Sequence, residues 1–261
     1  MTVLDRIIER KREEVARLAS SHSPGALRKS AESMPPCRDF ISGLEKSEGV
    51  AVIAEIKRSA PSTGRLKEVS DVVGLARTYE TGGAAALSVL TDGPFFGGNI
   101  EDLVRARAAV GLPVLRKDFM LDPIQLYEAR LAGADAVLLI VAALTDEVLA
   151  DLFQESRRLG MTAIVEVHDR KELDRALALN PPVVGINNRN LATLDVNLDT
   201  TIELKPLVPD RTLVIAESGI RDRNDVLRLR NAGVKAFLIG TTLMRSADPA
   251  ATLRGLCNGE A

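Results

Sequence analysis

The stretch VAVIAEIKRSAPSTG, residues 50–64, decides the fold, because it has the pattern of a buried β-strand that ends in charged side chains. Its first five residues are apolar and rich in β-branched side chains, which is typical of a strand covered on both faces. Glu55 and Lys57 follow two positions apart, so they point to the same side of the strand. A carboxylate and an ammonium at the mouth of an apolar strand indicate either a structural ion pair or a functional site.

A unit of apolar strand, loop and amphipathic helix repeats from residue 50 onward, with about 25–30 residues between strands. It predicts strands at Val50–Ile56, Ala85–Leu90, Pro113–Arg116, Ala136–Val141, Thr162–Val167, Val183–Ile186, Thr212–Ala216 and Ala236–Ile239. Helices are predicted near residues 71–81, 99–109, 123–132, 146–159, 170–178, 200–207, 222–231 and 249–256. This α/β pattern favours a single (β/α)₈ TIM barrel. A doubly wound open sheet is disfavoured, because no G-x-G-x-x-G turn follows the first strand.

The residues before the first strand are predicted to form an N-terminal helical extension, 1–48, followed by a barrel domain of residues 49–261. Residues 3–19 carry a partial apolar stripe between charges, which predicts a surface helix packed on the barrel. Residues 20–48 contain three prolines and are predicted to be irregular.

Composition and charge argue against several classes of protein. Hydrophobic residues make up 46% and charged residues 27%, which is ordinary for a globular chain. The net charge of −2, without a basic run, indicates no nucleic-acid partner. No stretch approaches the roughly 20 apolar residues of a membrane span, and the first residues lack a signal-peptide core. The two cysteines lack CxxC spacing and indicate a reducing compartment. We therefore expect a cytoplasmic protein.

Polar side chains lie at the carboxyl ends of the predicted strands, where a TIM barrel places its functional residues. They are Glu55, Lys57, Lys117, Glu166, Asn187, Arg189 and Glu217. A strand often becomes polar where its loop begins, so one such residue alone would mean little. Glu166 lies inside an apolar strand, however, and Glu217 directly follows four apolar residues, so the set favours one active site over chance.

A second pattern indicates a phosphate site. TIM barrels often bind phosphate with the loops after strands seven and eight and the start of a short extra helix. Ser218 and Gly219 occupy the first of these loops, and Gly240 and Thr241 the second. Glycine lets backbone N–H groups approach an anion, so these residues are predicted to bind phosphate. No His, Cys and carboxylate cluster has metal-ligand spacing, and we expect no metal.

Several segments that span most of the chain appear in one characteristic order. They are AEIKRSAPSTG (54–64), LRKDF (115–119), VLLIV (137–141), VEVH (165–168), GINNRNL (185–191), AESG (216–219) and LIG (238–240). In this combination the chain resembles the indole-3-glycerol-phosphate synthases, TIM-barrel enzymes of tryptophan biosynthesis.

The resemblance implies a carboxy-lyase that uses neither cofactor nor metal. Its substrate would be 1-(2-carboxyphenylamino)-1-deoxyribulose 5-phosphate, whose ring closure releases CO₂ and water. Lys117 would be the general acid, and Glu166 and Glu55 would serve later proton transfers, with the division between them open. The resemblance assigns substrate binding to Lys57, Asn187, Arg189 and Glu217, phosphate binding to Ser218, Gly219, Gly240 and Thr241, and the walls around the aromatic ring to Phe96, Phe119, Leu138 and Ile140.

Two alternatives remain open at this point. A phosphoribosylanthranilate isomerase would need a Cys/Asp pair, and neither cysteine lies at a strand end. A non-catalytic phosphosugar-binding barrel would be expected to lack Lys117 or Glu166, and both are present. In every case the partner is a small phosphosugar, and we expect a monomer.

Overall fold

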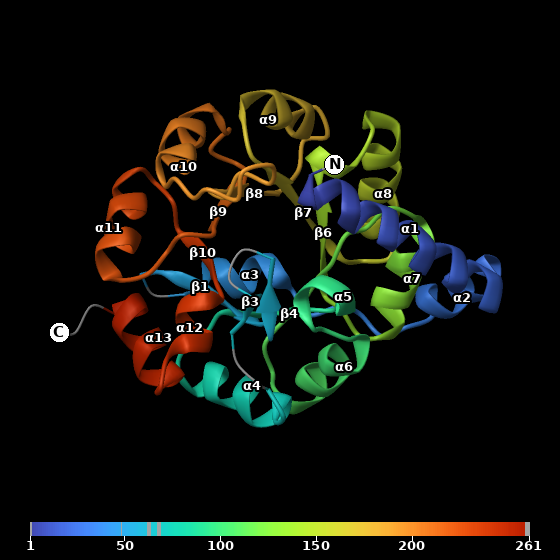
Figure 1. Cartoon of the computed structure of the whole chain (residues 1–261), viewed down its shortest axis with the longest axis horizontal. Helices are drawn as coiled ribbons and strands as arrows, with labels where there is room; N and C mark the ends of the chain where they lie inside the picture. Colours follow the sequence, from blue (N-terminus) through green and yellow to red (C-terminus); the bar gives the residue numbers. More distant parts are fainter. Residues whose placement is uncertain (1, 48, 62–63, 67–68, 259–261) are drawn as a thin grey trace.

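The structure, a computed structural model, describes residues 2–47, 49–61, 64–66 and 69–258. Its parallel strands close into a barrel in the order β1-β10-β9-β8-β7-β6-β5-β4 (Figure 1). They are β1 (Ala51–Ile56), β4 (Ala86–Leu90), β5 (Val114–Lys117), β6 (Ala136–Ile140), β7 (Thr162–Val167), β8 (Val183–Asn187), β9 (Leu213–Glu217) and β10 (Ala236–Ile239). The prediction of a (β/α)₈ TIM barrel is confirmed, and each predicted strand boundary lies within one residue of the observed boundary.

A ring of helices surrounds the barrel (Figure 1). It consists of α4 (Val72–Thr81), α6 (Ile100–Ala109), α7 (Pro123–Leu131), α8 (Asp146–Arg158), α9 (Arg170–Leu177), α10 (Asp199–Leu204), α11 (Arg223–Asn231) and α13 (Pro249–Asn258). Most of them begin after a side chain that accepts a backbone N–H of the first turn, namely Asp71, Asn99, Asp122, Thr145, Asp169 or Asp222. Such N-caps satisfy donors that a helix start leaves unpaired, so each loop sequence sets where its helix begins.

Shorter elements decorate the loops. They are the hairpin β2 (Ser59–Ala60) and β3 (Gly64–Arg65), the helices α5 (Gly93–Phe96) and α12 (Thr241–Arg245), and the 3₁₀ turns Val141–Ala143 and Lys205–Leu207. Two residues of the family-like segment 54–64, Ser62 and Thr63, lie outside the described residues. In the described part of the chain, none of the helices combines the length and apolar composition needed to cross a bilayer.

The prediction that residues 20–48 are irregular is wrong. This segment holds α2 (Pro24–Glu32) and α3 (Phe40–Glu45). Pro24 stands at the first helical position, where its missing N–H costs nothing, and Ser23 caps that helix. A proline that looked like a helix breaker is in fact a helix start.

The N-terminal extension covers both ends of the barrel. Helix α3 lies at the end where the strands begin, because Gly43 packs against Pro113, the residue just before β5. Helix α1 (Val3–Ser21) lies at the opposite end, and its Ile7 lines the cavity at the barrel mouth. The prediction of a helix here is confirmed, but its interpretation as a surface helix missed that it forms a wall of this cavity.

Side chains alternate along each strand between the barrel interior and the helix layer. In β1, Val52 and Ala54 pack in the outer core between strands and helices, whereas Ile53 packs in the inner core. Glu55 therefore faces the interior, as the period of two requires. The same alternation turns the last inward side chains of the other strands toward one mouth.

Candidate active site

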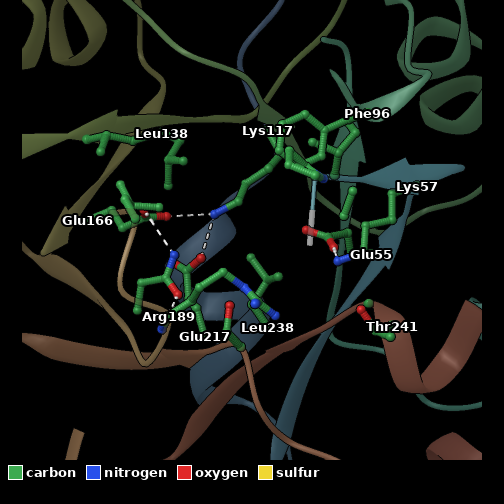
Figure 2. Close-up of a pocket in the computed structure, with 18 of the residues that line it drawn as sticks. Glu55, Lys57, Phe96, Lys117, Leu138, Glu166, Arg189, Glu217, Leu238 and Thr241 are labelled. Carbon is green, nitrogen blue, oxygen red and sulfur yellow. Dashed lines mark hydrogen bonds and ion pairs between the residues drawn. The ribbon is translucent and has the colours of Figure 1, made fainter. Parts of the chain in front are cut away.

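All of the predicted site residues line a single cavity at the carboxyl ends of the strands (Figure 2). The residues that were predicted from polar strand ends or from the resemblance are Glu55, Lys57, Phe96, Lys117, Phe119, Leu138, Ile140, Glu166, Asn187, Arg189, Glu217, Ser218, Gly219, Gly240 and Thr241. They come from strands and loops around the whole barrel, so its closure gathers them. Their individual roles stay predictions.

Lys117 is the centre of the charged part of this cavity. Its Nζ donates to Glu166 Oε2 at 2.8 Å and to Glu217 Oε2 at 2.5 Å (Figure 2). Glu166 Oε1 also accepts from Asn187 Nδ2 at 3.2 Å. The backbone N–H of Arg189 donates to Asn187 Oδ1 at 3.0 Å, which orients the amide. One ammonium is thus shared between two buried carboxylates.

The charges of this group keep Lys117 and Glu166 ionised. Burial disfavours the ammonium of Lys117, but attraction to Glu166, Glu217 and Glu55 outweighs it and raises the pKa of Lys117. Burial also disfavours the carboxylate of Glu166, but Lys117 and His168 outweigh it and lower the pKa of Glu166. Both groups therefore carry their full charges at neutral pH.

The pKa of Glu217 is shifted in the opposite direction to that of Glu166. The Oε1 atom of Glu217 is buried without a hydrogen-bond partner. Burial and repulsion from Glu166 outweigh the attraction of Lys117 and raise the pKa of Glu217 to about 7. Space for this side chain depends on Gly185 in β8, where a Cβ atom would clash with Glu217 Oε1 and lie 3.2 Å from Ile164. The group holds a proton that can be gained or lost near neutral pH.

His168 stands behind Glu166, two positions further along the chain. Its Nε2 lies 3.2 Å from Glu166 Oε1, and its Nδ1 lies 2.9 Å from Glu172 Oε2. Burial would lower the pKa of His168, but the two carboxylates raise it to about 10. A positively charged imidazole therefore helps to hold Glu166 as a carboxylate, even though the ring does not line the cavity.

Glu55 and Lys57 form a second ion pair across the cavity from Lys117 (Figure 2). Lys57 Nζ lies 2.6 Å from Glu55 Oε1. A Cβ atom at Gly240 would clash with that carboxylate and lie 3.0 Å from Lys57 Nζ. The absence of a side chain at Gly240 therefore lets the pair approach the loop after β10.

The two loops predicted to hold phosphate lie side by side. Ser218 and Gly219 have φ angles of 65° and 83°, in the left-handed region that turns the chain sharply after β9. Gly240 directly precedes α12, the short extra helix of many TIM barrels. Thr242 Oγ1 donates to the carbonyl of Ile220 at 2.6 Å and joins the loops. Backbone N–H groups at such turns and helix starts suit an anion.

Apolar side chains wall the remaining side of the cavity. The rings of Phe96 and Phe119 lie 6.1 Å apart between centroids, near Leu138 and Ile140. Sequence reasoning missed further apolar lining residues, among them Val3, Leu4 and Ile7 of α1 and Leu191 and Leu194 of the loop after β8. The apolar stripe of α1 was the available signal, but a stripe does not reveal what it covers.

Replacing Glu217 with glutamine is expected to remove a pH dependence of stability. The pKa of Glu217 is about 7 in the fold against a reference of 4.5, so the folded state keeps a proton that the unfolded state releases. The stabilisation is full below the reference value and is lost as the pH rises through 7. Glutamine lacks this proton equilibrium, so the stability of the variant relative to the native chain should rise between about pH 5 and about pH 8. Urea unfolding at both pH values measures the difference, and a constant difference contradicts the assignment.

The described residues hold no cluster of metal ligands. Their His, Cys, Asp and Glu side chains form no group of three or more that could hold an ion. The expectation of a site without metal or cofactor stays a prediction. The polar groups at the mouth are instead a set of proton donors, proton acceptors and anion-binding loops around an apolar wall.

Comparison with known proteins identifies one family, and the match extends over nearly the whole chain. The family model described as indole-3-glycerol phosphate synthase matches residues 4–256. A curated indole-3-glycerol phosphate synthase from Albidiferax ferrireducens is 50% identical over 257 residues and covers 97% of each chain. A relative of the same name from Laribacter hongkongensis is 47% identical, over 97% of this chain and 98% of the relative. Another, from Kineococcus radiotolerans, is 49% identical, over 95% of this chain and 92% of the relative. The chain belongs to the indole-3-glycerol phosphate synthase family.

Proposed function

We propose that the chain converts 1-(2-carboxyphenylamino)-1-deoxyribulose 5-phosphate to indole-3-glycerol phosphate, with release of CO₂ and water. Membership of the family supports the overall reaction. The observation that carries the assignment of residues is the ammonium of Lys117, which is shared by Glu166 and Glu217 in the cavity that Gly240 and Ser218 also line. A phosphosugar with an aryl group matches a cavity that has an anion-binding side and an apolar side.

Lys117 acts in the first step, the attack of the aromatic carbon on the ribulose carbonyl. Negative charge builds up on the carbonyl oxygen as the new C–C bond forms. An ammonium already in place donates a proton to that oxygen without reorganisation of solvent. Its paired carboxylates keep it charged before the substrate arrives. Loss of CO₂ then restores the aromatic ring.

Glu166 and Glu55 serve the dehydration that follows. Loss of water needs a proton for the departing hydroxyl and a base for the proton that leaves the ring system. The two carboxylates have different partners, because Glu166 binds Lys117 and Asn187, whereas Glu55 binds Lys57. Different surroundings let two carboxyl groups divide an acid role and a base role.

The other residues hold the substrate. Its phosphate would bind at Ser218, Gly219, Gly240 and Thr241, with Lys57 close by, since Gly240 lies near Lys57 Nζ. Its aryl ring would lie among Phe96, Phe119, Leu138 and Ile140. Asn187, Arg189 and Glu217 would keep the ribulose chain in register, and the cationic side chains offset the charge of the carboxylate and the phosphate.

The test is to mix the purified chain with the carboxyphenylamino deoxyribulose phosphate in the presence of a chelator and to follow indole fluorescence. We expect turnover without added metal or cofactor. Glu166→Gln should lower kcat at least about a hundredfold, because it removes one proton-transfer group. Glu147→Gln, at an exposed position of α8, is the matched control and should leave kcat unchanged. No indole from the native chain would refute the proposal.

A further inference from the structure

Lys11 is an unusual residue of helix α1. Its neighbours Arg10 and Arg12 are exposed, whereas Lys11 is 2% exposed. A lysine is almost never buried to this degree unless its ammonium is paired. Here the Nζ atom lies 2.8 Å from Asp118 Oδ1, 3.1 Å from Asp92 Oδ2 and 2.6 Å from Glu14 Oε2. One cation of the N-terminal helix is thus inserted between two carboxylates of the barrel.

Both aspartates belong to loops that carry site residues. Asp118 stands between Lys117 and Phe119, and its carboxylate also accepts from Thr91 Oγ1 at 2.5 Å. Asp92 caps α5, the short helix that contains Phe96. The buried ammonium of α1 therefore joins the loops after β4 and β5, the two loops that hold the aromatic wall.

The same face of α1 reaches the cavity. Ile7 lies one helical turn before Lys11 and lines the cavity together with Val3 and Leu4. Apolar packing alone tolerates sliding of a helix over its support, whereas a buried ammonium must stay within reach of its carboxylates. The position of Lys11 therefore sets where Ile7 stands over the cavity.

We propose that Lys11 is a positioning residue, which fixes α1 as the wall over the aryl end of the substrate pocket and aligns the Asp118 loop beside Lys117. The proposal rests on the proposed function and adds a residue that does not touch the substrate. Asp118 keeps Arg116 as a second cation at 3.3 Å, so the barrel loop has its own support. The specific consequence of losing Lys11 is then a displaced α1.

The main test compares Lys11→Met with the native chain. Methionine keeps an apolar stem of similar length and removes the charge. We expect KM for the carboxyphenylamino deoxyribulose phosphate to rise about tenfold or more, because the displaced α1 no longer packs over the aryl end of the pocket. A tenfold change corresponds to about 1.4 kcal/mol of binding free energy. Inhibition by inorganic phosphate, which probes the phosphate side of the cavity and not its aryl side, should stay unchanged. Amide hydrogen exchange should become faster in residues 3–21 but not in the barrel strands.

A merely structural role predicts a different result. Destabilisation lowers the amount of active protein, so the apparent kcat falls and KM stays the same. Arg107→Met is the matched control, because Arg107 pairs at 2.9 Å with the buried Asp135, just before β6 and far from the mouth. It should lower stability without changing KM.

A second variant keeps the test decisive if Lys11→Met does not fold. Asp92→Asn removes one of the carboxylate charges around Lys11 Nζ, and asparagine still caps α5. We expect a smaller rise of KM and the same faster exchange in α1. Unchanged KM and exchange in the folded variants, or a loss of phosphate inhibition equal to the loss of substrate affinity, overturns the role of Lys11. Absence of turnover by the native chain refutes the proposed function instead, and the exchange measurement still tests the contact.

Discussion

Replacing Lys117 with alanine is expected to lower kcat at least about a thousandfold, because general acid catalysis and stabilisation of the developing oxyanion each contribute about 10²–10³ or more. The substrate should still bind, since the phosphate loops and the aromatic wall do not contain Lys117. Indole fluorescence measures kcat, and calorimetric titration of the inactive variant measures the dissociation constant. Turnover within tenfold of the native rate would rule out the role of Lys117.

The same substitution is expected to destabilise the fold. It leaves Glu166 and Glu217, each about 2% exposed or less, without their shared cation. Removal of one partner from a buried ion pair costs about 3–5 kcal/mol. A second change, Glu217→Gln in the Lys117→Ala background, removes the second ionisable carboxyl group of the cluster and should recover part of the stability but none of the activity. Lys171→Ala, at an exposed position of α9, should alter neither quantity.

Replacing Gly240 with aspartate is expected to lower kcat/KM at least about a hundredfold through two separate effects. A Cβ atom at this position clashes with the carboxylate of Glu55, so the side chain and its partner Lys57 must move. The added carboxylate also repels the phosphate that the loop after β10 is proposed to hold. Steady-state kinetics and inhibition by inorganic phosphate measure the two effects.

Gly240→Ala separates these contributions. It brings the clash without the charge, so kcat should fall while inhibition by inorganic phosphate is largely kept. Gly240→Asp should lose both. Gly25→Asp is the control, because nothing lies within 4 Å of a Cβ atom there. Unchanged KM and unchanged phosphate inhibition in Gly240→Asp would show that phosphate binds elsewhere.

Much of the fold was predictable because its signals are local. The run of apolar, β-branched residues after residue 50 and its seven counterparts specify strands that are buried on both faces, and Asp, Asn and Thr caps specify where the helices begin. The inward direction of Glu55, Glu166 and Glu217 follows from the alternation of side chains along a strand. Helix α2 was missed because Pro24 was interpreted as a breaker and not as a first helical residue.

The polar residues of the site were predictable, but their pairings and the part of the apolar lining that comes from α1 were not. Strand ends indicated which side chains share the mouth, and all of them line the cavity. Nothing local shows that Lys117 is shared between Glu166 and Glu217, which are 49 and 100 positions away. Nor does the helical stripe of α1 show that Lys11 is buried against Asp92 and Asp118.

The sequence by itself determined the β/α repeat, the barrel and the identity of the side chains at its mouth, because these depend on patterns a few residues long. The tertiary structure alone decided which carboxylate holds which cation, which glycines make room for them, and that the first helix forms one wall of the cavity. Those outcomes depend on distances between segments far apart in the chain, and only closure of the barrel sets these distances.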